Sequence, residues 1–266
     1  MKKLLIQAAW PLAVLVAVIT AWDLCCRGFA IPAYVLPPPS AVLRVILERH
    51  QTLWNAFRIT AIEAGGGYLL SIIGGVVIAL FFAQSPLVRR SFYPYTILLQ
   101  TVPIVAIAPL ILMWFGSGLR SVMLVAFVIC LFPIIANTTQ GLISVPRNLI
   151  DLFVMSNASR SRQLLKLRLP HALPHLFVGL RISAGISVIG AVTGELFASS
   201  NAVGEGGLGY SITYANSQLQ TDYLFALVLT ASLLGFLFFF TVTALEWLCL
   251  RKWHDAGDSR KEPRDG

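Results

Sequence analysis

Long apolar runs alternate with short polar connectors along the whole chain. A helix needs about 20 apolar residues to span the hydrocarbon core of a bilayer, and six runs reach that length. The pattern therefore predicts six transmembrane helices, at about residues 5–24, 60–83, 93–115, 120–141, 174–197 and 222–249. Only residues 84–90 separate the second run from the third. We expect an all-α integral membrane protein with a single transmembrane domain over residues 1–266.

The composition supports a membrane protein. Hydrophobic residues make up 57% of the chain and charged residues only 12%, whereas soluble domains carry about 25% charged residues. The first run is too long for the apolar region of a signal peptide, and no small-residue cleavage site follows it, so we expect it to remain as the first span. The four cysteines lie in or beside apolar runs without metal-ligand spacing, which indicates packing and not a disulfide framework.

Most lysines and arginines fall on one side of the predicted membrane. Cytoplasmic loops carry an excess of these cations, and the excess sets the orientation. With both termini in the cytoplasm, the inner segments hold 14 of the 20 cations: Lys2, Lys3, Arg89, Arg90, Arg147, Arg160, Arg162, Lys166, Arg168, Arg251, Lys252, Arg260, Lys261 and Arg264. The last outer loop, residues 198–221, holds none. We therefore expect cytoplasmic termini and a cytoplasmic loop at about 142–173. This topology accounts for the net charge of +8 without a nucleic-acid partner.

Small residues recur every four positions in two of the runs. They are Gly67, Ser71, Gly75 and Ala79 in the second run, and Gly179, Ser183, Ser187 and Ala191 in the fifth. Helices in lipid associate through such small residues, because the backbones can then approach closely. The spacing predicts a compact bundle and carries no particular chemistry.

Enzymatic motifs are absent from the sequence. Residues 204–209 match G-x-G-x-x-G, but a dinucleotide site needs a strand before the motif and a helix after it, whereas this motif lies in an outer loop. There is no G-x-x-x-x-G-K-[S/T] motif, so we expect the chain not to bind ATP itself. His171 and His175 flank a predicted helix start, and we expect neither to hold a metal. The sequence predicts no catalytic residues.

Glu195 lies near the outer end of the fifth run. A charged side chain at the centre of a membrane helix costs about 2.5–3.5 kcal/mol on insertion scales, and less near the interface. We therefore expect Glu195 to face a polar cavity or a partner, as a residue that lines the solute pathway or its gate. Two structural alternatives remain: the side chain reaches the outer surface, or it holds a loop. Glu63, near the outer end of the second run, allows the same interpretations.

The loop at 142–173 is polar although it lies between two membrane spans. Residues 148–156 form a predicted short helix with an apolar face of Leu149, Leu152, Phe153 and Ser156. Asn157 tolerates the left-handed conformation that ends helices, and Ser159 can cap the next one. Residues 160–169 predict a basic amphipathic helix that ends at Pro170. Such a helix–turn–helix either lies on the lipid surface or docks a cytosolic partner.

Several segments resemble the permease subunits of ABC importers. Residues 151–159, DLFVMSNAS, followed by Leu169-Pro170 and Ala172-Leu173-Pro174, are similar to the "EAA" loop of that family, E-A-A-x-x-x-G-A-S and then L-P-x-A-L-P. The segments 36–40, 103–116, 194–197 and 207–210 resemble the branch that serves nitrate, taurine, alkanesulfonates and some aromatic or pyrimidine-type compounds. The resemblance covers nearly the whole chain.

This resemblance implies a type I importer fold and a set of partners. Two permease copies form the pathway, two cytosolic ATPase subunits bind ATP and magnesium, and an extracytoplasmic binding protein delivers the solute. The chain itself is then non-catalytic, holds no cofactor, and is a multi-pass protein of the bacterial inner membrane. The helix of each permease loop docks in a groove of an ATPase. On this basis the coupling residues are Leu149, Asp151, Leu152, Phe153, Ser156, Asn157, Ala158, Ser159 and Pro170.

Four positions depart from the family pattern. Asp151 replaces the usual Glu, Leu152 and Phe153 replace two alanines, and Asn157 replaces the glycine. Because Leu and Phe are larger than alanine, we expect either a wider groove in the partner or a shifted helix. We expect the importer to carry a small anionic solute of the sulfonate, nitrate or taurine type. The alternatives are a transporter or channel that works alone, for which paired charges in broken helices are missing, and a membrane enzyme, for which clustered His, Asp or Glu are missing.

Overall fold

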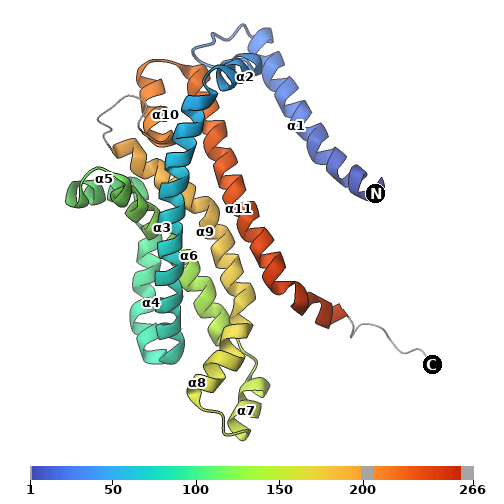
Figure 1. Cartoon of the computed structure of the whole chain (residues 1–266), viewed down its shortest axis with the longest axis vertical. Helices are drawn as coiled ribbons and strands as arrows, with labels where there is room; N and C mark the ends of the chain where they lie inside the picture. Colours follow the sequence, from blue (N-terminus) through green and yellow to red (C-terminus); the bar gives the residue numbers. More distant parts are fainter. Residues whose placement is uncertain (1, 199–205, 259–266) are drawn as a thin grey trace.

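The computed structural model describes residues 2–198 and 206–258, and in these ranges the chain is helical apart from its connectors (Figure 1). The elements are α1 (Lys2–Gly28), α2 (Pro39–Glu48), α3 (His50–Gln84), α4 (Pro86–Thr101), α5 (Ile104–Phe115), α6 (Leu119–Ile143), α7 (Arg147–Met155), α8 (Arg160–Gln163), a π-helical turn (Leu164–Arg168), α9 (Leu169–Phe197), α10 (Leu208–Ser217) and α11 (Thr221–Asp258). Gly204 and Glu205 of the glycine motif and the cations at 260, 261 and 264 lie outside the described residues.

Five of these helices are long and apolar enough to cross a membrane, and a bent pair makes a sixth. The five are α1, α3, α6, the continuous helix Arg160–Phe197, and α11. The bent pair is α4 and α5, whose axes differ by 96°. The all-α architecture with five or six apolar spans is therefore confirmed, although no single helix covers the predicted third run, 93–115.

The break between α4 and α5 has a local cause. Val102 and Pro103 both adopt extended conformations, with ψ of 123° and 120°. Proline has no N–H to continue the ladder, and its ring disfavours the helical conformation in the residue before it. Helix α4 also begins earlier than the apolar run, because Ser85 caps it and Pro86 occupies its first position.

The predicted stop at Pro170 is wrong, because the basic segment and the fifth span form one helix from Arg160 to Phe197. A π-helical turn at Leu164–Arg168 precedes the proline, and the Leu169 N–H donates to the Leu164 carbonyl, five residues back. A proline within an α-helix normally clashes with the carbonyl of residue i−4 and removes one hydrogen bond. The wider π turn lies where that clash would occur, so the helix continues.

The core of the bundle is α6, which packs against α3 on one side and α9 on the other. A Cβ added at Gly67 of α3 would lie 2.5 Å from the Met123 carbonyl oxygen, and one at Gly179 of α9 would lie 2.9 Å from the Pro133 carbonyl oxygen. All eight small residues of the two predicted stripes are buried. The prediction of close packing through these stripes is confirmed.

Polar side chains add hydrogen bonds inside this bundle. The Ser183 hydroxyl donates to the Cys130 carbonyl at 2.9 Å, and the Cys130 thiol donates to the Ser183 carbonyl at 3.3 Å. The Tyr68 hydroxyl donates to the Leu180 carbonyl at 2.9 Å. In lipid such bonds each contribute about 0.6 kcal/mol on average, so they fix the register of α3, α6 and α9 more than they add stability.

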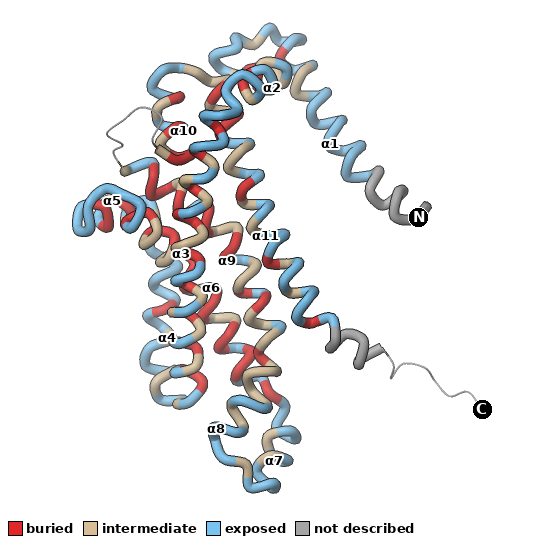
Figure 2. Tube along the Cα trace, viewed as in Figure 1, coloured by how far each residue is buried: buried red, intermediate tan, exposed pale blue. Residues whose placement is uncertain are grey.

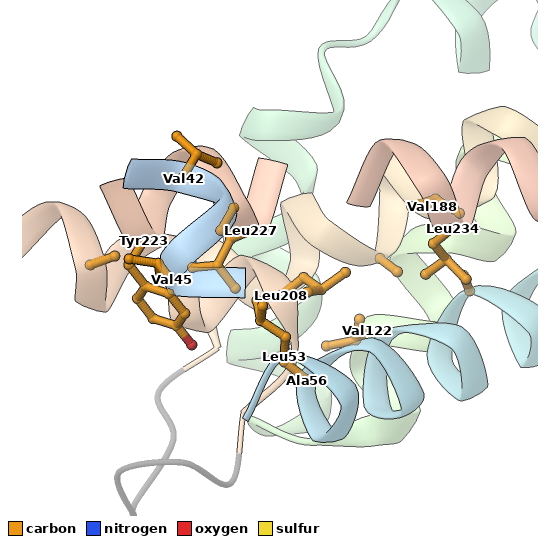
Figure 3. Packing of buried hydrophobic residues seen from close by; sticks show 14 residues of the cluster. Val42, Val45, Leu53, Ala56, Val122, Val188, Leu208, Tyr223, Leu227 and Leu234 are labelled. Atoms are coloured by element: carbon orange, nitrogen blue, oxygen red, sulfur yellow. The ribbon is translucent and has the colours of Figure 1, made fainter. Parts of the chain in front are cut away.

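The helices outside this three-helix core differ in how closely they pack against the rest of the chain. Helix α1 contacts little else in its own chain and is exposed over most of its described length (Figure 2). At the end of the bundle where α2 and α10 lie, α2, α3, α10 and α11 meet in an apolar cluster. In this cluster Leu208 packs near Leu53 and Ala56, and Tyr223 lies beside Val45 (Figure 3). This cluster places α10 against the ends of α3 and α9.

The close approach at Gly67 gives a test of the packing. Gly67→Val should destabilise the fold by about 1–3 kcal/mol, because the nearest atom is a backbone carbonyl that cannot move aside. Gly185→Val is the matched control, since nothing lies within 4 Å of a Cβ at Gly185. The measurement is the midpoint of thermal unfolding of the purified full chain in detergent. Equal midpoints for the two variants would contradict the tight contact between α3 and α6.

Candidate functional site

Two sites at opposite ends of the bundle contain the residues that the sequence singled out. The first is the α7–α8 corner, which projects beyond α3, α6 and α9 (Figure 1). Helix α7 follows the buried Val145 and the exposed Pro146, which has a ψ of 136° and directly precedes the first helical residue. The second site lies where the far end of α9 meets α3 and the start of α10.

The turn after α7 has the conformation that the sequence predicted. Asn157 has a φ of +50°, in the left-handed region. Its N–H donates to the Val154 carbonyl at 2.9 Å, and the Ala158 N–H donates to the Phe153 carbonyl at 3.0 Å. These two bonds form a Schellman motif, which satisfies carbonyls that would otherwise lack partners at the helix end. The short helix and its stop at Asn157 are therefore confirmed.

Helix α8 starts directly after this turn. The Ser159 hydroxyl accepts a hydrogen bond from the Arg162 N–H at 3.3 Å, which confirms Ser159 as the cap. The Gln163 side-chain amide donates to the Ala158 carbonyl at 3.1 Å. With the Schellman motif on one side and these two bonds on the other, the angle between α7 and α8 is fixed by the backbone of residues 156–159.

The outward edge of α7 is apolar and exposed. Leu149, Leu152 and Met155 follow one another at three-residue spacing and are 39%, 57% and 82% exposed. Phe153, which the sequence also assigned to this face, is only partly exposed, as is Pro170. Asp151 is exposed, and neither of the ion pairs in the described ranges includes it. Met155 was missed by the sequence analysis, although its spacing from Leu152 matches one helical face.

At the opposite site, the Glu195 side chain is 3% exposed and accepts two hydrogen bonds. The Thr60 hydroxyl donates to its Oε1 at 2.6 Å, and the Gly209 N–H donates to its Oε2. The Thr60 oxygen in turn accepts from the Leu208 N–H at 2.8 Å. The first N–H groups of α10 thus have partners from α3 and α9, as a capping residue would supply.

Glycines allow this contact between α10 and Glu195. A Cβ at Gly207 would lie 2.0 Å from the Glu195 Oε1, and a Cβ at Gly209 would lie 2.3 Å from the Val192 carbonyl oxygen. The second half of the G-x-G-x-x-G motif therefore serves close packing of backbone against a buried carboxylate. Nothing in the sequence pattern indicated Thr60, because a threonine in an apolar run is ordinary.

A cavity of about 350 Å³ adjoins this site, and Glu63 and Glu195 both line it. Glu63 is buried, and its Oε2 atom has no hydrogen-bond partner among the described residues. Glu195 therefore lines a cavity, although most of the other lining residues are apolar or glycine. The alternative that Glu195 holds a loop agrees with its hydrogen bond to the start of α10. In the described ranges no three His, Cys, Asp or Glu side chains come together in an arrangement that could hold a metal ion.

Comparison with known proteins places these features in a family. Residues 71–247 match the model of the binding-protein-dependent transport system inner membrane component. A probable ABC transporter permease protein of Haemophilus influenzae is 34% identical over 91% of this chain and 95% of its own. A formylaminopyrimidine transport permease of Halalkalibacterium halodurans is 31% identical over 92% and 96%, and the taurine transport permease of Escherichia coli is 28% identical over 93% and 90%.

A solved structure agrees on the fold. In the MetNI methionine ABC transporter in inward-facing conformations, one chain matches with a TM-score of 0.52 at 20% identity, over 73% of this chain and 94% of that one. The predicted resemblance to the permease subunits of ABC importers is thus confirmed over most of the chain. It follows that this chain belongs to the binding-protein-dependent transport system inner membrane components, the non-catalytic permease subunits of ABC importers.

Proposed function

We propose that this permease forms the solute pathway as a homodimer and docks one ATPase subunit on the α7 helix of each copy. Membership of the family implies ATPase partners and a binding protein, and the proposal concerns their number and place. The observation that carries it is the exposed edge of Leu149, Leu152 and Met155, on a helix whose angle to α8 is fixed by hydrogen bonds. An apolar helix edge of this kind fits a hydrophobic groove. ATP and magnesium bind to the partner ATPases.

The distribution of lysine and arginine assigns an orientation to the chain. Five cations lie between the start of α7 and the start of α9: Arg147, Arg160, Arg162, Lys166 and Arg168. The loop 198–221 has no lysine or arginine. Cations concentrate on the cytoplasmic side of membrane proteins. We therefore place α7 and both termini in the cytoplasm, and α2 and α10 on the outer side where a binding protein arrives.

For the solute we keep the expectation of a small anion of the sulfonate, nitrate or taurine type. One relative is named for taurine and another for formylaminopyrimidine, so the pyrimidine class is the second candidate. Binding of taurine, nitrate and formylaminopyrimidine to the cognate binding protein, measured by calorimetry, separates the two classes.

We assign Glu195 to the anchoring of α10 and not to direct contact with the solute. Both of its oxygens already accept hydrogen bonds, from Thr60 and from the Gly209 N–H. A carboxylate that caps a helix start in this way fixes the loop, and through the loop it shapes the outer end of the pathway. The pathway role that the sequence suggested is thereby indirect.

Orientation is tested by cysteine accessibility. The four native cysteines are replaced by serine, and Ser161→Cys or Ser217→Cys is introduced, because both side chains are exposed. An impermeant thiol reagent applied to intact cells should label the variant at 217 and not the one at 161. Permeabilised cells should label both, which controls for accessibility. Labelling at 161 in intact cells would invert the assigned orientation.

Docking is tested by placing a charge on the exposed edge of α7. Leu152→Asp should lower solute-stimulated ATP hydrolysis of the reconstituted importer roughly tenfold or more, because the contact would bury a carboxylate without a partner. Val154→Asp is the matched control, since Val154 is equally exposed, at 56%, but lies off the edge. Insertion and dimer mass should stay unchanged in both. If Val154→Asp loses coupling and Leu152→Asp keeps it, the docking edge is on the other side of α7.

The role of Glu195 is tested by graded substitution. Glu195→Leu leaves the Gly209 N–H and the Thr60 hydroxyl without their acceptor, at a cost of about 1–3 kcal/mol for each unsatisfied group. Glu195→Gln keeps one acceptor oxygen, so its energetic cost should be smaller than that of Glu195→Leu. Hydrogen exchange of the amides at 207–210 should rise in the order Glu, Gln, Leu. Glu246→Gln, which removes a charge from α11, serves as the control. Unchanged exchange together with lost transport in Glu195→Gln would support the direct pathway role instead.

A further inference from the structure

A second cavity, of about 490 Å³, lies between the end of α3, the start of α4 and the base of α8. Its position is separate from the exposed edge of α7 and from the Glu195 site. The polar residues around it come from both sides of the gap: Gln84 from α3, Arg160, Ser161 and Gln163 from α8, and Arg168 from the π turn. The two arginines make this cavity a candidate site for an anion.

Among the described residues, no acidic side chain forms an ion pair with the arginines of this cavity. Asp151 is the only acidic residue between Glu63 and Glu195. The ion pairs found in the described ranges, Arg27–Asp23 and Arg181–Glu246, both lie elsewhere. Arg168 donates one N–H to the Ala83 carbonyl at 3.2 Å, which leaves most of its five donors for another acceptor. Two guanidinium groups on one cavity match the oxygens of a phosphate group, which they can bind with paired hydrogen bonds.

The π turn is the reason that both arginines reach the cavity. Eight residues of regular α-helix end about 80° past two full turns, so Arg160 and Arg168 would point in clearly different directions. The wider turn over Leu164–Arg168 reduces this offset, and both side chains line the same space. Helix α4 begins at the same cavity with Pro86, and the start of a helix carries partial positive charge.

The position of the cavity relative to the membrane indicates the source of the phosphate. The cavity adjoins the last residues of α3, a membrane span, so it lies where hydrocarbon gives way to headgroups. Nearby, Leu87 and Leu165 are 75% and 63% exposed, which suits contact with acyl chains better than contact with water. Basic pockets between membrane helices bind the headgroups of anionic lipids.

We propose that this cavity binds the phosphate of one anionic phospholipid, with Arg160 and Arg168 as its main ligands and Ser161 as a neutral donor. The bound lipid then connects the base of α8 to the α3–α4 connection. It thereby holds the corner that carries α7 at a defined distance from the membrane surface. The lipid is retained by charge-assisted hydrogen bonds and by burial of its acyl chains, whereas free phosphate has only the first of these.

The test uses native mass spectrometry of the purified full chain in detergent, titrated with phosphatidylglycerol. Wild-type protein should retain one phosphatidylglycerol in preference to phosphatidylcholine. The double variant Arg160→Gln/Arg168→Gln should bind it about tenfold or more weakly, since charge-assisted hydrogen bonds to two guanidinium groups are lost. The matched control Arg90→Gln/Arg162→Gln removes the same charge from α4 and α8 outside the cavity, and it should change binding less than about twofold.

A further variant covers the case in which loss of the Arg168–Ala83 bond disturbs the fold. Ser161→Glu keeps both arginines and places an acid in the cavity, so it should lower phosphatidylglycerol binding while size-exclusion profiles stay unchanged. Millimolar inorganic phosphate or glycerol 3-phosphate should not displace the lipid. The proposal is overturned if the cavity variants bind like wild type, if the control pair loses as much binding, if phosphatidylcholine binds equally well, or if free phosphate displaces the lipid.

Discussion

The packing of α3 and α9 onto α6 through glycine, alanine and serine is the contact on which the rest of the molecule depends. Lipid tails are as apolar as leucine, so burial of apolar surface does little to hold membrane helices together. What remains is van der Waals contact and a few hydrogen bonds, and both require backbones that nearly touch. At Gly67 and Gly179 the neighbouring atoms are main-chain carbonyl oxygens of α6, which leaves no space for any larger residue. This three-helix unit gives the two ends of the bundle a rigid support.

Both candidate sites are built on the ends of that unit by capping of helices. At one end a Schellman motif and the Ser159 cap set the direction of α7 relative to α8. At the other, Thr60 and Glu195 supply acceptors for the first N–H groups of α10. In each case a helix end needs partners because its backbone groups have none within the helix. The chain meets that need with side chains that also fix the position of a functional element.

The sequence predicted local structure well wherever a residue type has a direct conformational effect. Asn157 and Ser159 adopt the roles assigned to them, because their effects depend on neighbours within one or two turns. The two small-residue stripes are buried as predicted, because a four-residue spacing places small side chains on one face of each helix. The two errors, at Val102–Pro103 and at Pro170, concern prolines within apolar stretches. Proline disrupts a regular helix, but whether the chain bends or absorbs the ring in a π turn depends on surrounding packing that periodicity does not reveal. The partnership of Thr60 with Glu195 spans 135 residues and was equally beyond a local pattern.

The helix that begins at Arg160 and ends at Phe197 has 38 residues without interruption, which corresponds to a length of about 57 Å. Its lower end carries the corner with α7, and its upper end carries Glu195 and the start of α10. The helix is therefore long enough to reach from one face of a membrane to the other. Because α6 packs closely along this helix through small residues, the two ends belong to one rigid unit and cannot move independently. The α7–α8 corner and the Glu195 site are thus joined by one continuous helix, without any relay of separate contacts.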